Sequence, residues 1–386
     1  MTPLRRSLAV LLYGFALLGM PGAALGVAWP SMADDLARDL GDLGVLTLLT
    51  GISYALVSLV SGSLTKRVPA GRLLVLAAVL ATVGLVGYAA ANSFIVLAIA
   101  AIPIGIAGGT VDAIGNAHVA VRHGSRAMGF IHASFGFGAM LAPLMMTALA
   151  AIGAAWRVGF ALLAVAQIVL AVGFLITREA YRMPMEGRKE RPERTGSYRL
   201  LGLSVWTFFV YAGVEGSTGF WAFTLLSEGQ GVNATVAGLA VAAHWGALFA
   251  SRLALGVVGD RVPADVTVTL SGIFLVVGLG AMWWNPSAIV SIGGLVVAGF
   301  ASGPVFPLEV ILTTPRFGEQ FTPWAVGYQL AAATTAIAFV PAIIGMLVNS
   351  FGPLVIAPAL VILAIATWAS LETLRVAGAR ERFVHV

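Results

Sequence analysis

The stretch that decides the fold is Gly62-Ser-Leu-Thr-Lys-Arg-Val-Pro-Ala-Gly-Arg72, a short polar break in a very apolar chain. Its central tetrapeptide, Arg67-Val-Pro-Ala70, occurs again 194 residues later as Arg261-Val-Pro-Ala264. The same offset aligns glycines elsewhere, namely Gly105 and Gly109 with Gly299 and Gly303, and Gly19 and Gly22 with Gly213 and Gly216. Because 194 is about half of the 386 residues, this spacing indicates one structural unit that is written twice.

The composition around these repeats is that of a membrane protein. Apolar residues make up 59% of the chain, charged residues only 10%, and the mean hydropathy is +0.95. An ordinary soluble protein has about 25% charged residues, and 22 basic plus 17 acidic side chains cannot cover a soluble protein of this length. We therefore expect the chain to lie in a bilayer.

The apolar runs number twelve, and each is long enough for a helix that crosses a bilayer core of about 30 Å. We expect spans at 7–29, 43–65, 73–91, 94–121, 127–152, 156–177, 200–226, 236–258, 266–284, 288–314, 321–349 and 354–374. Arg5 and Arg6 before the first run also fit a secretory signal peptide. We favour a retained span, because the run is longer than a signal peptide needs and a second span follows it closely.

The charged residues alternate between the two sides of the membrane. With the N-terminus in the cytoplasm, all 22 Lys and Arg residues except Arg38, Arg157 and Arg252 fall on cytoplasmic loops or tails. The outer loops carry acids instead, namely Asp34, Asp35, Asp39, Asp42 and Glu228. The net charge of +5 therefore reflects topology in a multi-pass protein of the cell membrane with both termini cytoplasmic, and we expect no nucleic-acid partner.

The longest polar stretch, residues 178–199, divides the twelve spans into two sets of six. It predicts a cytoplasmic linker between an N-terminal half, residues 1–177, and a C-terminal half, residues 200–386. A role for this linker at anionic lipid headgroups is the alternative to a plain tether. Two similarly oriented halves are expected to face each other across a central cavity, which each side of the membrane reaches in turn.

The segment Gly256-Val-Val-Gly-Asp260-Arg261 resembles the Gly-x-x-x-Asp-Arg signature of the major facilitator superfamily. The resemblance covers essentially the whole chain and implies an all-α fold of twelve transmembrane helices in two pseudo-symmetric halves. In that family the loop locks neighbouring helices by charge pairing, so it implies gating roles for Arg67, Asp260 and Arg261. The first copy has Lys66 where the acid belongs. A purely topological role for these basic residues is the alternative.

Within the superfamily the chain most resembles the fucose-permease-like branch of sugar and metabolite transporters. The resemblance rests on the stretches Asp112-Ala-Ile-Gly-Asn116, Arg126-Ala-Met-Gly-Phe-Ile-His132-Ala-Ser-Phe-Gly136-Phe-Gly138 and Tyr211-Ala-Gly-Val-Glu215-Gly-Ser-Thr-Gly-Phe-Trp221. It implies a sugar or related metabolite as the solute. The fucose carrier of that branch has an acid on its first helix, whereas residues 7–29 here carry no charge.

Three acids lie inside predicted spans, where a charge is costly and normally marks an ion or substrate path. Asp112 and Glu215 are the expected proton-coupling residues, since both lie deep in their spans. His132 joins them, because a hairpin of neighbouring spans would bring its imidazole near Asp112. The alternative for both acids is a structural role in hydrogen bonding. Glu309 lies nearer a helix end, so we expect a gate or structural acid there rather than a central proton site, and we expect Arg252 to be a gate partner rather than a ligand.

The expected substrate contacts are polar or aromatic side chains at similar depths in the membrane. Amides and imidazoles can bond hydroxyls, while indole faces cover C–H surfaces. These criteria select Asn116, Trp221, His244, Trp245 and Gln329. Bonds between helices are the alternative for the polar side chains, and packing for the tryptophans.

The sequence offers no sign of catalysis. With no cysteine, it excludes disulfides, Cys-ligated zinc and Cys nucleophiles, and it has no His-Glu-x-x-His, Gly-x-Ser-x-Gly or phosphate-loop pattern. We expect no enzyme activity, catalytic residue, metal or cofactor. The predicted function is a monomeric, proton-coupled secondary transporter of a small polar solute, such as a sugar. The alternatives are a proton-driven exporter of drugs or metabolites and an uncoupled facilitator.

Overall fold

The computed structural model describes residues 3–123, 125–181, 196–258 and 261–384, and these residues form helices and short connections without a strand. The first six long helices are α1 (Pro3–Asp35), α2 (Leu43–Leu64), α3 (Ala70–Ala89), α4 (Phe94–Arg122), α5 (Ser125–Ala151) and α6 (Trp156–Thr177). The other six are α7 (Tyr198–Thr224), α8 (Ala234–Val258), α9 (Ala264–Trp284), α10 (Ala288–Phe317), α11 (Thr322–Phe351) and α12 (Ile356–Val384). Short helical turns are η1 (Leu40–Asp42), η2 (Arg178–Tyr181), η3 (Leu225–Gly229) and η5 (Pro353–Val355).

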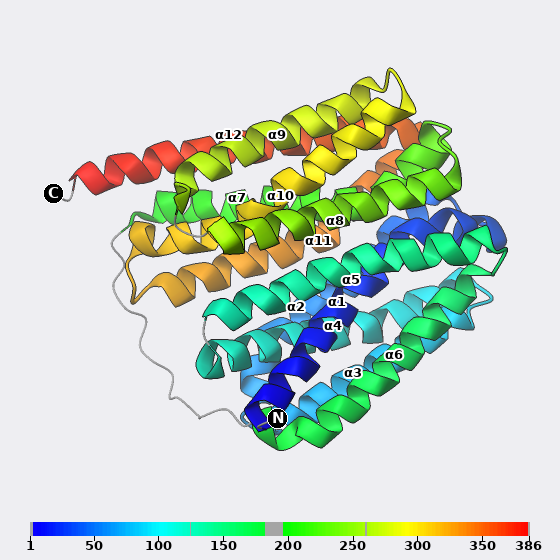
Figure 1. Ribbon diagram of the computed structural model, residues 1–386, viewed down its shortest axis with the longest axis horizontal. Coiled ribbons are helices and arrows are strands. Elements are labelled where there is room, and N and C mark those ends of the chain that lie inside the picture. Colours follow the sequence, from blue (N-terminus) through cyan, green and yellow to red (C-terminus); the bar gives the residue numbers. More distant parts are fainter. Residues whose placement is uncertain (1–2, 124, 182–195, 259–260, 385–386) are drawn as a thin grey trace.

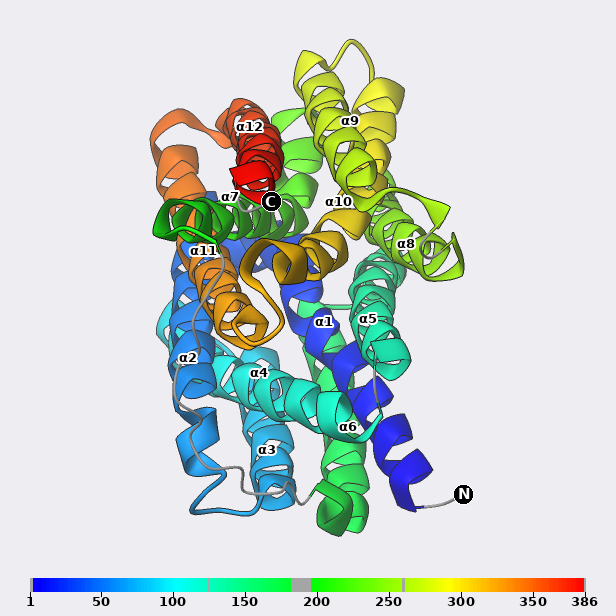
Figure 2. The ribbon, with the colours of Figure 1, turned by 90° about the vertical axis from the view of Figure 1, so that its left-hand side faces the viewer.

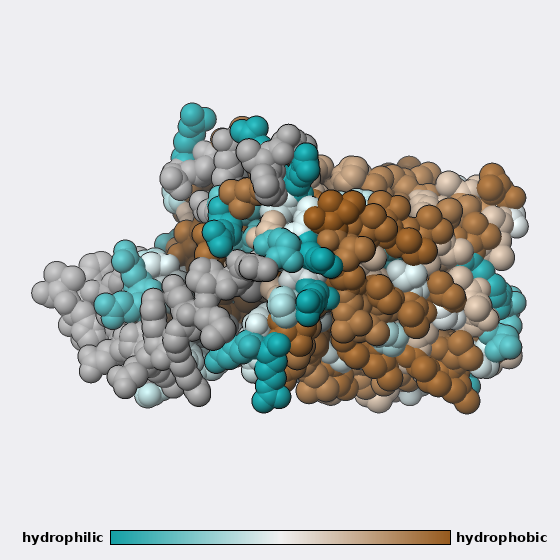
Figure 3. Space-filling model, turned by 90° about the horizontal axis from the view of Figure 1, so that it is seen from below, coloured by the Kyte–Doolittle hydropathy of each residue, from teal (hydrophilic) through white to brown (hydrophobic). Residues whose placement is uncertain are grey.

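Twelve helices of the described chain are long and apolar enough to cross a membrane, which confirms the predicted fold class. In lipid every backbone polar group must be satisfied within the protein, and a helix does this along its whole length. Brown apolar side chains cover a broad part of the face in Figure 3, and hydrophilic ones gather beside it and at its right-hand end. Several helices run beyond the predicted spans, because hydropathy detects only the apolar part of each helix.

The 194-residue repeat reappears as pairs of equivalent contacts in the two halves. A Cβ on Gly105 would lie 2.2 Å from the Thr50 carbonyl, and one on Gly299 would lie 2.3 Å from the His244 carbonyl. Side-chain hydrogen bonds are repeated as well. Thr50 bonds the Ala101 carbonyl in the first half, and His244 bonds the Leu295 carbonyl at the equivalent place in the second half. Glycine is therefore required where α4 crosses α2 and where α10 crosses α8, as the repeat in the sequence predicts.

The two halves, α1–α6 and α7–α12, are stacked in Figure 1, and both chain ends lie at the same end of the molecule. We call this end the terminal side and the other the closed side. On the closed side the halves meet backbone to backbone at three glycines. A Cβ on Gly41 would lie 2.0 Å from the Gly345 carbonyl, and one on Gly44 would lie 2.9 Å from the Ala342 Cα. The backbone amide of Gly41 also donates a 2.7 Å hydrogen bond to the side-chain oxygen of Asn349.

Two further helix pairs hold the halves together toward the closed side. A Cβ on Gly26 of α1 would lie 2.9 Å from the Gly219 carbonyl of α7, and one on Gly238 of α8 would lie 2.0 Å from the Thr147 hydroxyl of α5. Contacts this short exclude solvent and any solute from the closed side.

The terminal side is built differently. Four glycines have open space beside them, so that a Cβ added there would lie more than 4 Å from any heavy atom of the described chain outside its own stretch of helix. They are Gly62, Gly129, Gly256 and Gly327. These glycines lie near the terminal-side ends of α2, α5, α8 and α11, the helices that cross between the halves elsewhere. The halves therefore pack closely at the closed side, and these four glycines make no such contact with the other half at the terminal side.

Candidate functional site

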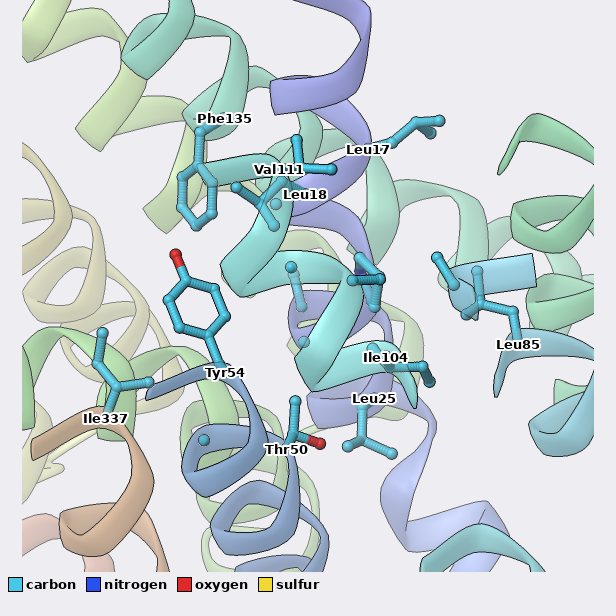
Figure 4. A pocket seen from close by; sticks show the side chains of 18 of the residues that line it. Leu17, Leu18, Leu25, Thr50, Tyr54, Leu85, Ile104, Val111, Phe135 and Ile337 are labelled. Carbon is cyan, nitrogen blue, oxygen red and sulfur yellow. The ribbon is translucent and has the colours of Figure 1, made fainter. Parts of the chain in front are cut away.

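A cavity of about 290 Å³ lies between the halves, and both contribute to its wall. Figure 4 shows labelled side chains of α1, α2, α3, α4 and α5 around it, with Ile337 of α11 at the left of the view. Most of the wall is apolar. Its polar side chains are Thr47, Thr50, Tyr54, Tyr88, Gln167, Glu215, Trp245 and Thr334.

Glu215 is the one acid in this wall among the described residues, and no Lys or Arg lines it. Its carboxylate accepts hydrogen bonds from the Tyr211 hydroxyl and, at 3.4 Å, from Arg252. Arg252 also donates a 3.2 Å hydrogen bond to the Gly303 carbonyl. The equivalent bond in the first half runs from the Ser58 hydroxyl to the Gly109 carbonyl. The second half thus replaces a serine by an arginine, which compensates the charge of Glu215.

The Tyr211 hydroxyl can serve both protonation states of Glu215. It also lies 2.7 Å from the Ser302 carbonyl, so one hydroxyl hydrogen has two acceptors. When Glu215 is ionised, the hydrogen is needed by its carboxylate. When Glu215 is protonated, its own hydrogen can be donated to Tyr211, whose hydrogen then turns to Ser302. The hydroxyl can therefore form a hydrogen bond with either form of the carboxyl group.

Asp112 lies in the other half and just outside the cavity wall. Its carboxylate accepts a 2.8 Å hydrogen bond from Asn116, one turn further along α4, and interacts with the Tyr54 hydroxyl of α2. The Asn116 amide nitrogen is therefore bound to Asp112, and the amide oxygen of Asn116 has no partner among the described residues. Tyr54 connects this pair to the cavity, where Figure 4 shows its ring pointing inward.

The structure does not bring His132 to Asp112, and no bond joins them in the described part of the chain. The His132 ring instead packs near Phe15 of α1 and Phe306 of α10, at 6.0 and 6.3 Å between centroids. The expected hairpin contact is absent because α4 packs on α2 and α3, whereas α5 packs on α1 and α8. His132 lies instead on the side of Arg252.

Of the predicted substrate contacts, Trp245 lines the cavity and His244 does not. The Trp245 ring lies so close to α7 that a Cβ on Gly219 would be 2.5 Å from it. His244 points between α8 and α10, where it bonds the Leu295 carbonyl at 3.0 Å. Neighbouring residues on one helix face different ways, so similar depth alone does not place a side chain in the cavity.

Trp221 and Gln329 are buried inside the C-terminal half, away from the cavity wall. The Trp221 indole donates to the Pro341 carbonyl at 3.1 Å. The Gln329 amide bonds Ser204 at 2.7 Å and Thr313 at 2.9 Å. Both side chains therefore join α11 to its neighbours in the structure, which is the alternative that the sequence left open for them.

Glu309 forms a buried ion pair with Arg316 on the same helix. Their atoms are 2.6 and 3.4 Å apart, and the side chains are 3% and 2% exposed. The pair lies within the C-terminal half, so in this conformation it does not bridge the two halves. The structure therefore supports the structural role for Glu309.

The Arg316→Met variant is expected to unfold at a clearly lower temperature than the unaltered protein. It would leave the Glu309 carboxylate buried without a partner, at a cost of about 3–5 kcal/mol. The double variant Glu309→Gln/Arg316→Met removes both charges and should recover most of the loss. Tryptophan fluorescence during heating of the purified protein measures both effects, and equal melting of the single and double variants would contradict this account.

The predicted gating residues of the loops are only partly described. Arg67 and Arg261 are exposed at the terminal side, as their positions next to the helix ends predict. Asp260 lies outside the described residues. Arg252 instead contacts the acid of the cavity wall, Glu215.

Several residues of the site and of its closure are not among the predicted ones. Tyr54, Tyr88 and Gln167 line the cavity, and Asn349 closes it. Tyrosine and glutamine inside predicted spans are the signal for the first three. Asn349 lies at a helix end, where an amide is too common to single out.

Comparison with known proteins agrees with this architecture. The sequence model of the Major Facilitator Superfamily matches residues 11–308. A curated relative, "Bypass of stop codon protein 6" of Saccharomyces cerevisiae, is 24% identical to the chain, and the match covers 88% of the chain and 76% of that protein.

Solved structures with the same fold include two transporters. One is a bacterial homolog of the human lysosomal transporter Spinster in an inward-facing, unoccupied conformation, with 18% identity and a TM-score of 0.71 over 99% of this chain and 97% of that one. The other is a variant of the nucleoside transporter NupG, with 11% identity and a TM-score of 0.75 over 97% of this chain and 100% of that one. At these identities the likeness shows the fold alone.

Proposed function

The chain belongs to the Major Facilitator Superfamily, and on that premise we propose that it is a proton-linked secondary transporter that works by alternating access. The observation that carries the proposal is one cavity walled by both halves, which meet in close helix contacts on the closed side. Rocking of the halves about such a cavity would expose it to each side in turn. The activity is then transport rather than catalysis.

The proton site of this proposal is Glu215. It lies in the cavity wall, where solute and proton can both reach it, and Tyr211 can bond either protonation state. Asp112 is the second candidate, because it interacts with Tyr54 of the wall but does not itself line the cavity. A carboxyl that faces the solute directly is better placed to exchange a proton for it.

The apolar wall of the cavity favours a drug or metabolite with a large apolar part over a sugar as the solute. A sugar presents hydroxyls on every side, and each hydroxyl buried without a hydrogen-bond partner costs free energy. The resemblance to the fucose-permease-like branch favours a sugar, but four of the five predicted sugar contacts lie outside the wall, namely Asn116, Trp221, His244 and Gln329. A proton-driven exporter of a drug or metabolite with a large apolar part fits the wall better.

The proposed setting is the cell membrane, with the terminal side in the cytoplasm. The exposed basic residues Lys66, Arg67, Arg72 and Arg261 lie on the terminal side, and positive loops stay cytoplasmic during insertion. On the closed side Asp35 pairs with Arg157 and Asp42 with Arg38. In this orientation the described conformation opens to the cytoplasm, the side from which an exporter loads.

Transport in proteoliposomes with an imposed pH gradient tests the proposal. We expect accumulation of 1-methylquinolinium, a two-ring cation, when the lumen is acidic, and no accumulation of L-fucose. The accumulation should vanish when an ionophore collapses the gradient, with protein-free liposomes as the baseline. Accumulation that does not depend on the gradient would contradict proton coupling, and accumulation of L-fucose would favour the sugar class instead.

A further inference from the structure

The cavity extends from the interface into the interior of the N-terminal half. This extension, which we call the N-half lobe, is lined by the buried residues Leu17, Ala77, Ala78, Ala81, Leu85, Gln167 and Leu170. It lies among α1, α3 and α6, beyond the wall residues of α4, and Figure 4 shows Leu17 and Leu85 around it. The alanines at 77, 78 and 81 give α3 a flat surface here, which leaves the space unfilled.

Space of this kind is unusual in a protein interior. Interiors pack as densely as organic crystals, and voids larger than a water molecule are few. A cavity of about 150 Å³ lined by apolar side chains stays dry and binds benzene. The whole cavity here has about twice that volume, 290 Å³, so it suits a solute about the size of two rings.

Gln167 is the one polar side chain of the N-half lobe. It is 6% exposed, and among the described residues its amide has no hydrogen-bond partner. The amide faces the cavity, so a polar atom of a bound solute can form a hydrogen bond with it. The lobe therefore offers an apolar surface with one amide, which can donate to or accept from a polar atom on a ring.

The opposite end of the cavity carries Glu215, the one acidic residue among the described side chains that line it. Arg252 lies behind this carboxylate and does not line the cavity, and its bond to the Gly303 carbonyl remains available without Glu215. The lobe and the carboxylate thus give one cavity an apolar end and an end with a carboxylate that can accept hydrogen bonds.

We propose that the N-half lobe is a binding subsite for the ring portion of an organic amine or quaternary ammonium solute, whose cationic group meets Glu215. This proposal rests on the proposed transport function and adds the class of solute and the residues that select it. Ala77, Ala78 and Ala81 set the size of the ring that enters.

Binding of matched probes to the purified protein in lipid nanodiscs tests this subsite by calorimetry. The probes are 1-methylquinolinium, tetramethylammonium without rings, and 2-naphthalenesulfonate as a two-ring anion. In the unaltered protein the quinolinium should bind most tightly. The Ala81→Leu variant should weaken quinolinium binding by about tenfold or more, because a filled apolar pocket excludes the ring. Ala161→Leu, which adds the same atoms at an exposed position on α6, is the matched control.

A second variant guards against loss of folding in Ala81→Leu. Leu85→Ala enlarges the lobe and should raise the affinity for 10-methylacridinium, a three-ring cation, relative to 1-methylquinolinium. The subsite would be overturned if Ala81→Leu and Leu85→Ala kept the probe affinities of the unaltered protein while Glu215→Gln still lowered the affinity for every cation. That outcome would leave the proposed function standing. Tighter binding of 2-naphthalenesulfonate than of the quinolinium would overturn the charge assignment. Absence of pH-driven transport would instead count against the proposed function itself.

Discussion

Oxidation of the Thr147→Cys/Gly238→Cys variant is expected to reduce transport to the level of protein-free liposomes, and a thiol reductant is expected to restore it. The two positions join α5 of one half to α8 of the other near the closed side. A Cβ on Gly238 would lie 3.1 Å from the Thr147 Cβ, slightly closer than the about 3.5–4.5 Å of a disulfide. To reach the disulfide range, the ends of α5 and α8 need to move apart by only about a few tenths of an ångström.

Alternating access requires the closed side to open, so a covalent bond across it must stop transport. The chain contains no cysteine, so the introduced pair is the only one that can form a bond. A disulfide between Cys residues placed at Gly213 and Val340 is the matched control, because these residues are 3.4 Å apart by the same measure but belong to one half. It should form and leave transport intact.

The decisive readout combines thiol labelling with transport. Labelling with a maleimide-linked polymer reports whether the bond has formed, and radiolabelled 1-methylquinolinium reports transport in the same sample. A fully formed bond between positions 147 and 238 with undiminished transport would show that the closed side does not open during the cycle, and would contradict alternating access.

The architecture was predictable because it depends on long patterns. Hydropathy reports each helix through about 20 residues, and the 194-residue offset identifies glycines that perform the same task in both halves. Gly105 and Gly299, aligned on sequence alone, each face the carbonyl of a residue that is itself related by the repeat, Thr50 and His244. Close helix crossings of this kind tolerate only glycine, so the sequence retains them.

The site was less predictable, because depth in the membrane does not tell which way a side chain points. His244 and Trp245 are neighbours at one depth, yet only Trp245 reaches the cavity. Glu215 was predicted from its charge, but its partners Tyr211 and Arg252 come from rotation of α7 and α8 about their axes. The N-half lobe had no signal at all, since small residues such as Ala81 mark close packing as often as open space.

Replacement of Glu215 by glutamine is expected to abolish accumulation driven by a pH gradient while exchange of solute across the membrane continues. Glutamine keeps the size of the side chain and can still accept a hydrogen bond from Tyr211, but it cannot release a proton. Exchange needs only the movement of the loaded halves, so it should persist at saturating 1-methylquinolinium. Arg252 loses its partner, and its bond to Gly303 remains to hold it.

The matched control for this experiment is Asp112→Asn. Asp112 interacts with Asn116 and Tyr54 outside the cavity wall, so its replacement should leave the coupling in place. Accumulation and exchange are measured on the same proteoliposomes, which separates loss of coupling from loss of binding. If Asp112→Asn loses accumulation and Glu215→Gln keeps it, the proton route lies in the N-terminal half. The Tyr211 hydroxyl, which lies between Glu215 of α7 and the Ser302 carbonyl of α10, would then hold these two helices together and take no part in the proton route.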